Sequence, residues 1–252
     1  MTGMIRALDA ELYKLRRTLA LWLAAIAPLS VVALQVLVVY QRRGMYLNRG
    51  GNAWIWFGEA IYPYWTWVAL PLFIGLQAAL LAGLEHRTDQ WKHLYALPVS
   101  RGAVYVAKQA VGLLLIGLNT LCLVVFTLLG GWLLQVVEPG LGFTWDVPWA
   151  RLIRFGLGVY LASWLTIAIH IWVSHRWKSF VVSMSISVAA SIFAMFAAES
   201  RLALLYPWVL PRLAAETFST GEMRWAALAV GSLAGLAFVV WGCRDTTSRD
   251  VV

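Results

Sequence analysis

The four histidines of this sequence are its side chains best suited to proton transfer or metal binding. His86 and His93 lie seven residues apart, which places them on one face of a helix. His170 and His175 lie five apart and do not share a face. Neither pair has the cysteines or further histidines nearby that a zinc site requires, so the spacing predicts no metal site.

The sequence also lacks the motifs of common nucleotide-binding and hydrolytic sites. It has no G-x-x-x-x-G-K-[ST] loop, so the chain has no P-loop with which to bind ATP. The G-x-S-x-G and H-E-x-x-H motifs are absent as well. Cys122 and Cys243 lie far apart in apolar runs, as small buried residues do, and do not suggest a disulfide framework. We therefore expect a non-catalytic chain without a cofactor of its own.

The composition indicates a membrane protein. Of the 252 residues, 61% are hydrophobic and 13% are charged, whereas a soluble domain is nearer half apolar and a quarter charged. Six apolar runs are long enough to cross the hydrocarbon core as helices, and helices are required because an unpaired backbone amide is costly in lipid. We predict an all-α polytopic membrane protein in which residues 1–252 form one domain. The expected spans are residues 18–40, 61–84, 109–137, 155–174, 179–198 and 225–243.

Lysine and arginine predict how these spans are oriented. If the N-terminus is cytoplasmic, the cytoplasmic segments hold every lysine and more than half of the 20 basic residues, as the positive-inside rule expects. We therefore expect both termini in the cytoplasm. The net charge of +8 is explained by this orientation and gives no indication of nucleic-acid binding.

Residues 1–17 have the pattern of an amphipathic helix. Ile5, Leu8, Leu12 and Leu15 follow one another at spacings of three and four, while most charged residues fall elsewhere on the helical wheel. Such a helix lies in the cytoplasmic interface of the membrane. It is either a plain anchor or a mechanical element, and the sequence favours neither.

Polar side chains are rare inside the spans. Gln35, Gln77 and Asn119 either line a cargo path or form hydrogen bonds between helices, and the second role is favoured. His170 is interpreted as a hydrogen-bonded residue near the cytoplasmic end of its span, rather than as a ligand or a proton relay.

Span five carries a stripe of serines at a strict spacing of four. Its members are Ser179, Ser183, Ser187 and Ser191. Because small residues let helix backbones approach closely, the stripe predicts a packing seam rather than a conduction path. The seam lies either within one chain or between two.

Two external connections have unusual compositions. The sequence "GGNAWIWFGEAIYPYWTW" predicts an aromatic belt at the outer interface, which is favoured over a wall for stacking a ligand. The aromatic residues concerned are Trp54, Trp56, Phe57, Tyr62, Tyr64, Trp65 and Trp67. In "YPWVLPRLAAETFSTGE", Pro207 and Pro211 predict short, broken helices at the outer surface.

Residues 85–108 connect spans two and three on the cytoplasmic side, and they are more elaborate than a simple connection requires. Their first stretch has an acid early and a lysine later, as the helix dipole favours. Pro98 ends this stretch, Ser100 is a suitable N-cap for the next helix, and Lys108 marks the return to the membrane. Such a segment indicates a docking element for a partner protein.

This stretch resembles a known family. The sequence "GLE" at the end of span two, followed by "DQWKHLYALPVSRGAVYVAK", is similar to the permeases of ABC-2 type transporters, as are the N-terminal "KLRRT" and the six spans. The resemblance implies a type V ABC exporter fold, a second permease that is identical or related, and two copies of a separate ATPase that binds ATP and Mg²⁺. It implies that a coupling helix is seated in the ATPase. The residues that would make this contact are Glu85, Arg87, Asp89, Trp91, Lys92, Tyr95, Pro98 and Arg101.

The resemblance further implies that the serine stripe falls near the dimer seam and that the connection after Tyr206 is the outer gate. In chain size and small external loops the sequence looks most like the lantibiotic-immunity and bacitracin-resistance branch. The chain would then be a permease subunit in the bacterial cytoplasmic membrane that exports a peptide antibiotic, drug or lipid-like compound from the cell or membrane. The alternatives are a membrane-embedded enzyme that uses its histidines and an ATP-independent membrane scaffold.

Overall fold

The computed structural model describes residues 2–15, 18–47, 50–87, 100–143, 146–177 and 179–248, and for Thr2 and residues 84–87 it describes the backbone alone. Every regular element in these residues is a helix, which confirms the predicted all-α class. Six helical units are long and apolar enough to cross a membrane, as predicted. These units are Leu19–Gln41, Ala53–Gly83, Arg101–Val137, Trp149–Arg176, Phe180–Ala197 and Trp225–Ser248.

Several of these units contain more than one element. The α-helices are α1 (Thr2–Leu15), α2 (Leu19–Gln41), α3 (Arg43–Tyr46), α4 (Ala53–Tyr64), α5 (Leu70–Arg87), α7 (Arg101–Val137), α8 (Trp149–Ala162), α9 (Trp164–Arg176), α10 (Phe180–Ala197), α11 (Leu210–Ala215), α12 (Thr217–Thr220), α13 (Trp225–Ala229) and α14 (Gly235–Ser248). Two π-helical turns, η1 (Trp65–Ala69) and η4 (Val230–Ala234), join α4 to α5 and α13 to α14. Short 3₁₀ turns lie at η2 (Pro139–Leu141) and η3 (Ala203–Leu205).

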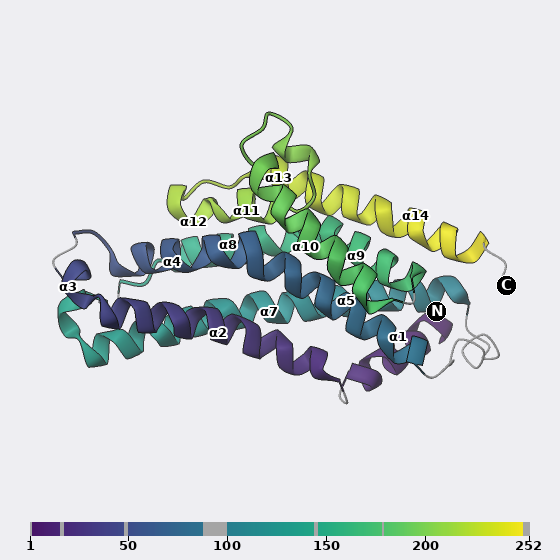
Figure 1. Cartoon of the computed structure of the whole chain (residues 1–252), viewed down its shortest axis with the longest axis horizontal. Coiled ribbons are helices and arrows are strands. Elements are labelled where there is room, and N and C mark those ends of the chain that lie inside the picture. Colours follow the sequence, from purple (N-terminus) through teal and green to yellow (C-terminus); the bar gives the residue numbers. More distant parts are fainter. Residues whose placement is uncertain are drawn as a thin grey trace.

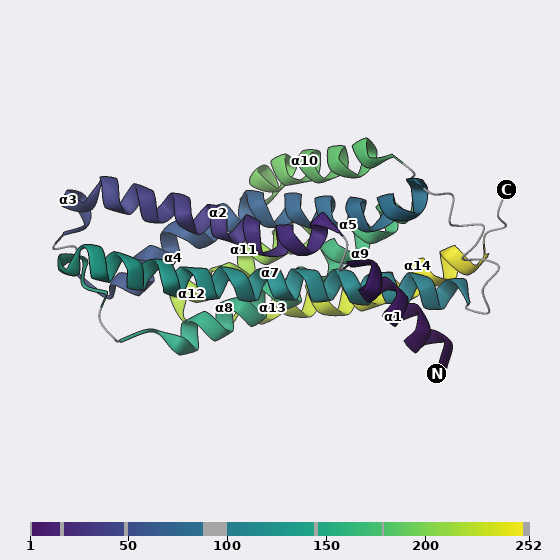
Figure 2. The same cartoon turned by 90° about the horizontal axis from the view of Figure 1, so that it is seen from below.

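The long helices form an elongated bundle with distinct ends (Figure 1). Helix α1 and the end of α14 lie at one end, where α5 also ends and α7 begins (Figure 1). Helices α3 and α12 lie toward the other end. Turned by a quarter, the bundle shows α1 crossing the first part of α7 (Figure 2). Because α5 ends where α7 begins, these two long helices run in opposite directions through the bundle.

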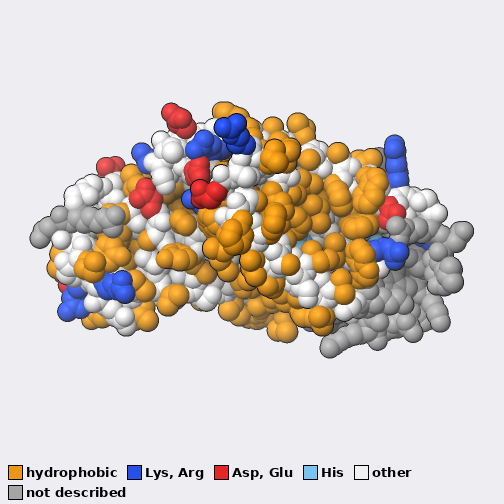
Figure 3. All heavy atoms as spheres, turned by 45° about the horizontal axis from the view of Figure 1, so that its top comes forward, with side chains coloured by type: hydrophobic (Ala, Val, Ile, Leu, Met, Phe, Trp, Pro, Cys, Tyr) orange, Lys and Arg blue, Asp and Glu red, His pale blue; other side chains and the backbone are white. Residues whose placement is uncertain are grey.

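The surface of the bundle is largely hydrophobic between its two ends. Hydrophobic side chains cover much of the molecule between its ends, while charged side chains gather at the ends and around the short helices between α10 and α14 (Figure 3). Spans α2 and α10 expose bulky residues such as Leu34 and Phe196. This distribution is the one that a lipid-facing surface requires.

The helix of span two begins at Ala53, well before the expected start at residue 61. Asn52 caps it: the side-chain oxygen accepts a hydrogen bond from the amide of Trp54 at 2.9 Å, and the side-chain nitrogen donates to the carbonyl of Asp146 at 2.8 Å. Pro63 cannot donate its own backbone hydrogen bond, and the π-helical turn η1 follows directly. The hydroxyl of Thr66 donates to the carbonyl of Tyr62, one turn earlier, at 2.9 Å.

The predicted aromatic belt is wrong for most of its members. Tyr64 is exposed and Trp67 is half-buried, but the other members lie inside the bundle: Trp54, Trp56, Phe57, Tyr62 and Trp65 are all buried. Tyr62 stacks on Phe155 of α8 with ring centroids 3.7 Å apart and meets Phe218 of α12 edge to face at 4.7 Å. Trp54, Trp56 and Phe57 instead meet Phe143, which follows η2, edge to face. These rings therefore form part of the core.

Span four is broken at Ser163, between α8 and α9. The hydroxyl of Ser163 donates to the carbonyl of Val159 at 2.6 Å, and the π-helical turn η4 packs against this break. A Cβ atom added at Gly231 would lie 2.5 Å from the carbonyl oxygen of Ala162, and one added at Gly235 would lie 2.8 Å from the amide of Leu165. Glycine at both positions therefore permits direct contact between two backbones.

Candidate functional site

The residues expected to contact an ATPase lie largely outside the described part of the chain. Glu85 and Arg87 belong to the last turn of α5, where the backbone alone is described. Arg101 is the first residue of α7 and is half-buried. Ser100 caps α7, as predicted, because its hydroxyl accepts a hydrogen bond from the amide of Ala103 at 3.3 Å. The remaining members lie outside the described residues: Asp89, Trp91, Lys92, Tyr95 and Pro98.

A buried ion pair involves Lys108, the last residue of the segment 85–108. Lys108 Nζ donates to Glu11 Oε2 at 3.1 Å, and both side chains are only 3% exposed. The other carboxylate oxygen of Glu11 accepts from Lys14 at 2.7 Å. Helix α1 is thus joined to α7 by charges that have lost nearly all of their water, and each charge depends on its partner.

The sequence did not indicate that these two residues would pair. Lys108 was expected at the edge of the membrane, but it lies inside the bundle, two turns into α7. Glu11 lies between Leu8 and Leu15 on the same side of α1, and an acid in the middle of an apolar stripe was the signal that could have revealed it.

The buried face of α1 differs in part from the predicted apolar stripe. Leu15 and Ala7 are buried together with Glu11, Leu8 and Leu12 are half-buried, and Ile5 is 57% exposed. The helix packs against α7 rather than lying free at a surface. Leu8, Leu12 and Leu15 also belong to a cluster that includes residues of α2, α5 and α7, so these neighbours determine which face of α1 is buried.

Other polar contacts join α7 to α9, and α9 in turn to α14. Gln109 donates to the hydroxyl of Tyr105 at 2.9 Å and to the carbonyl of Ala168 in α9 at 3.3 Å. The indole of Trp172 donates to Asp245 of α14 at 3.1 Å. The end of the bundle beside residues 85–108 is thus connected across α7, α9 and α14.

His170 is buried, but its partner comes from an unexpected segment. The indole Nε1 of Trp208, in the connection between α10 and α11, donates to His170 Nε2 at 3.0 Å. The hydroxyl of Thr166, one turn earlier in α9, donates to the carbonyl of Pro207 at 2.9 Å. His170 was expected near the cytoplasmic end of its span. In the structure it instead binds Trp208 of the connection between α10 and α11, which was expected on the outer side. This connection therefore reaches deep along α9.

The serine stripe is an internal surface of the chain. The hydroxyls of Ser183 and Ser174 share a hydrogen bond of 2.7 Å, and Ser187 donates to the carbonyl of Pro71 in α5 at 2.8 Å. Ser191 is buried and donates to the carbonyl of Ser187, whereas Ser179 is the exposed N-cap of α10. The buried part of the stripe is occupied by α5 and α9, so it is not available as a seam for a second chain.

The polar residues considered for a cargo path are not brought together. Gln35 is half-buried on α2, and Gln77 and Asn119 are buried on α5 and α7. The amide groups of Gln77 and Asn119 have no hydrogen-bond partner among the described residues. Gln77 lines a small cavity otherwise formed by aliphatic side chains and glycine of α5, α7 and α9.

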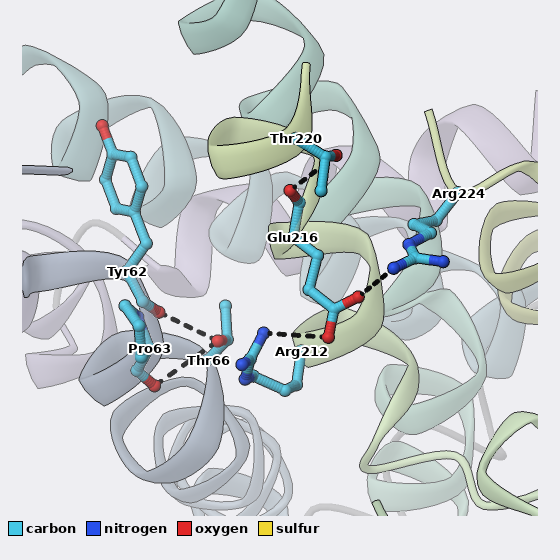
Figure 4. A network of polar contacts seen from close by, with 7 residues as sticks. All are labelled: Tyr62, Pro63, Thr66, Arg212, Glu216, Thr220 and Arg224. Carbon is cyan, nitrogen blue, oxygen red and sulfur yellow. Dashed lines mark hydrogen bonds and ion pairs between the residues drawn. The ribbon is translucent and has the colours of Figure 1, made fainter. Parts of the chain in front are cut away.

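A charged network holds the short helices at the expected outer side. Glu216 accepts from Arg224 Nη2 at 2.6 Å and from Arg212 Nη1 at 3.4 Å, and Arg212 lies between Glu216 and the turn that contains Thr66 (Figure 4). Arg151 Nη1 donates to the carbonyls of Phe218 and Ser219, at 3.1 and 2.9 Å. Arg154 Nη1 donates to the carbonyl of Gly221 at 2.7 Å.

Helices α11 and α12 are the short, broken helices that Pro207 and Pro211 predicted. Pro211 occupies the first turn of α11, where its missing N–H costs nothing. The sequence did not indicate that Arg151 and Arg154 of α8 would donate to the carbonyls at the C-terminal end of α12.

Comparison with known proteins agrees with this architecture. The model of the ABC-2 family transporter proteins matches residues 7–194, more than half of the chain. The matched region begins within α1, includes the Glu11–Lys108 pair and the connection between α5 and α7, and ends in α10. No curated protein and no solved structure matches the chain. The chain belongs to the ABC-2 family of transporter membrane proteins.

Proposed function

We propose that this chain is the non-catalytic permease subunit of an ATP-driven exporter. In this function residues 85–108 dock a separate ATPase, which binds ATP and Mg²⁺ in place of the P-loop that this sequence lacks. Two ATPase copies and a second permease, identical or related, complete the transporter. The cargo is an amphipathic peptide antibiotic, drug or lipid-like compound, as in the lantibiotic-immunity and bacitracin-resistance branch.

The Glu11–Lys108 ion pair is the observation that best supports this proposal. A force applied to residues 85–108 by a closing ATPase would act directly on the start of α7. Because Lys108 and Glu11 are buried and joined at 3.1 Å, α1 would move with α7. The mechanical role of the N-terminal helix, left open by the sequence, thereby gains a physical basis.

The arrangement of the ends supports the same function. Helix α1, the end of α5, the start of α7 and the end of α14 lie at one end of the bundle (Figure 1). We propose that this end faces the cytoplasm of a bacterial cell, where the ATPase has access to it. The opposite end, with α11 and α12, then faces outward and contains the outer gate.

Purification with candidate partners tests this function. The chain is co-expressed with the ATPases encoded beside it, purified in mild detergent and analysed by mass spectrometry. We expect a P-loop protein in equal amount, and we expect it to be lost in a Glu85→Ala/Trp91→Ala double variant. Arg201→Ala is the control and should retain the ATPase, because Arg201 is an exposed residue between α10 and α11. A well-folded chain that retains no ATPase from any neighbouring candidate contradicts the proposal.

A further inference from the structure

Arg212 of α11 has more hydrogen-bonding capacity than its neighbours use. Its Nη1 donates a long bond of 3.4 Å to Glu216, and its buried Nε has no hydrogen-bond partner among the described residues. Its guanidinium lies over the indole of Trp67, 5.6 Å from the ring centroid. A guanidinium held against an aromatic face with unused donors is well suited to recognise a phosphate group.

Glu216 does not neutralise this arginine completely. The same carboxylate accepts a bond of 2.6 Å from Arg224, which is much shorter than its bond to Arg212. One carboxylate between two guanidinium groups leaves a positive charge. Arg151 and Arg154 add to it, because the acceptors of their hydrogen bonds described above are backbone carbonyls of residues 218–221 rather than carboxylates. The local field therefore favours an additional anion.

The surroundings of Arg212 are apolar. It borders a shallow depression whose other members are Trp67, Ala194, Ala198, Trp208 and Val209. Ala194 belongs to α10, and Ala198 directly follows its last residue. Phe193 and Phe196 of the same helix, and Leu205 beyond it, are more than half exposed and continue the apolar surface. A cation flanked by tryptophans at the edge of such a surface matches the headgroup level of a membrane.

We propose that this depression binds the phosphate headgroup of an amphiphile, with Arg212 contacting the phosphate and Trp67, Trp208 and Ala198 contacting the adjoining hydrocarbon. The inference deepens the proposed function and rests on it in one respect, namely that the site faces the outer leaflet and is open to cargo. The bound amphiphile is either a resident bilayer lipid or the transported compound, since the two share this chemistry.

Native mass spectrometry of the full chain in detergent tests the site. The probes are a phosphatidic acid and the phosphatidylcholine with the same acyl chains, and inorganic phosphate serves as a competitor. We expect phosphatidic acid to bind about tenfold more tightly than phosphatidylcholine, and we expect Arg212→Gln to remove this preference. Arg201→Gln, which removes an exposed arginine of the same connection, retains the preference.

Two further variants separate binding from folding. Arg212→Lys keeps the charge and retains part of the preference, while Glu216→Gln removes the competing carboxylate and strengthens the binding of phosphatidic acid. The proposal is overturned if Arg212→Gln binds as the wild type does, or if Arg201→Gln loses the preference equally. It is also overturned if inorganic phosphate displaces the lipid at equal concentration, because the apolar lining would then contribute nothing.

The source of the amphiphile is distinguished with the assembled transporter. Release of phosphatidic acid on addition of ATP identifies it with the cargo, and retention identifies a resident lipid; both results support the site. Because the binding measurement needs no ATPase, failure of the site leaves the partner experiment unaffected. Failure to find an ATPase likewise leaves the binding result intact.

Discussion

Glu11 on α1 and Lys108 on α7 form an ion pair of 3.1 Å although they are 97 positions apart in the sequence. Both side chains are almost completely buried, and Lys14 closes the other side of the carboxylate. The pair connects the N-terminal helix to α7, whose first two turns form the last part of residues 85–108. It therefore joins the two parts of the chain that an ATPase would have to move together.

Glu11→Gln is expected to destabilise the protein by about 3 kcal/mol, because Lys108 loses its charged partner in a buried position. The loss is measured by thermal unfolding in detergent, and ATP-driven transport in the assembled complex should fall with it. Lys14→Gln is the matched control: Lys14 is partly exposed, so its removal should cost no more than about 1 kcal/mol. Equal effects of the two changes would contradict a special role for the buried pair.

Trp208→Phe should loosen the connection between α10 and α11 without creating a large cavity. The change removes the indole donor to His170 and should cost about 1 kcal/mol in the free energy of unfolding. Trp225→Phe is the control, since Trp225 is 70% exposed. Thermal unfolding distinguishes the two, and identical stability of both variants would show that the bond contributes nothing.

Gly231→Ala should be poorly tolerated. The new methyl group would lie 2.5 Å from the backbone carbonyl of Ala162, and a backbone neighbour cannot rotate away as a side chain can. We expect a loss of about 1–3 kcal/mol from this overpacking. Gly156→Ala in α8 is the control, because its nearest neighbour would be Val124 at an ordinary 3.8 Å, and helix propensity favours alanine there. A Gly231→Ala protein as stable as the Gly156→Ala protein would contradict the close contact at Ser163.

Ser187→Leu tests whether the serine stripe is internal. Ser187 lies against Gly75 and donates to the carbonyl of Pro71, so a leucine should displace α10 from α5 and lower the yield of folded chain. Val188→Leu, on the exposed side of α10, should leave the yield unchanged. The measurement is the monodisperse fraction in size-exclusion chromatography. A folded monomer that only loses its ability to form dimers would instead place the stripe between two chains.

Where sequence and structure agree, local chemistry is the reason. The length of the apolar runs determined the number of spans, since every backbone amide in lipid must be paired within a helix. Ser100 as a cap and Pro211 in the first turn of α11 follow from side-chain chemistry that depends only on near neighbours. These features required no knowledge of which helices meet.

Where they differ, a partner distant in sequence is the reason. Tyr62 resembles a residue of an interfacial belt, but Phe155 of α8 and Phe218 of α12 cover it in the folded chain. His170 has its partner in a segment that the sequence assigned to the outer side, and Lys108 has its partner 97 positions away in α1.

The sequence by itself determined the class, the six spans and the family resemblance, because hydrophobic length and local motifs are properties of continuous segments. Tertiary structure alone decided that Glu11 binds Lys108, that Ser187 contacts α5 and that Ser183 contacts α9. It also decided that Arg212 stands over Trp67 with a donor unused. In a chain whose spans are all similarly apolar, hydrophobicity does not select which faces meet. Packing of small residues and pairing of buried polar groups make that selection, and both depend on helices that are far apart in sequence.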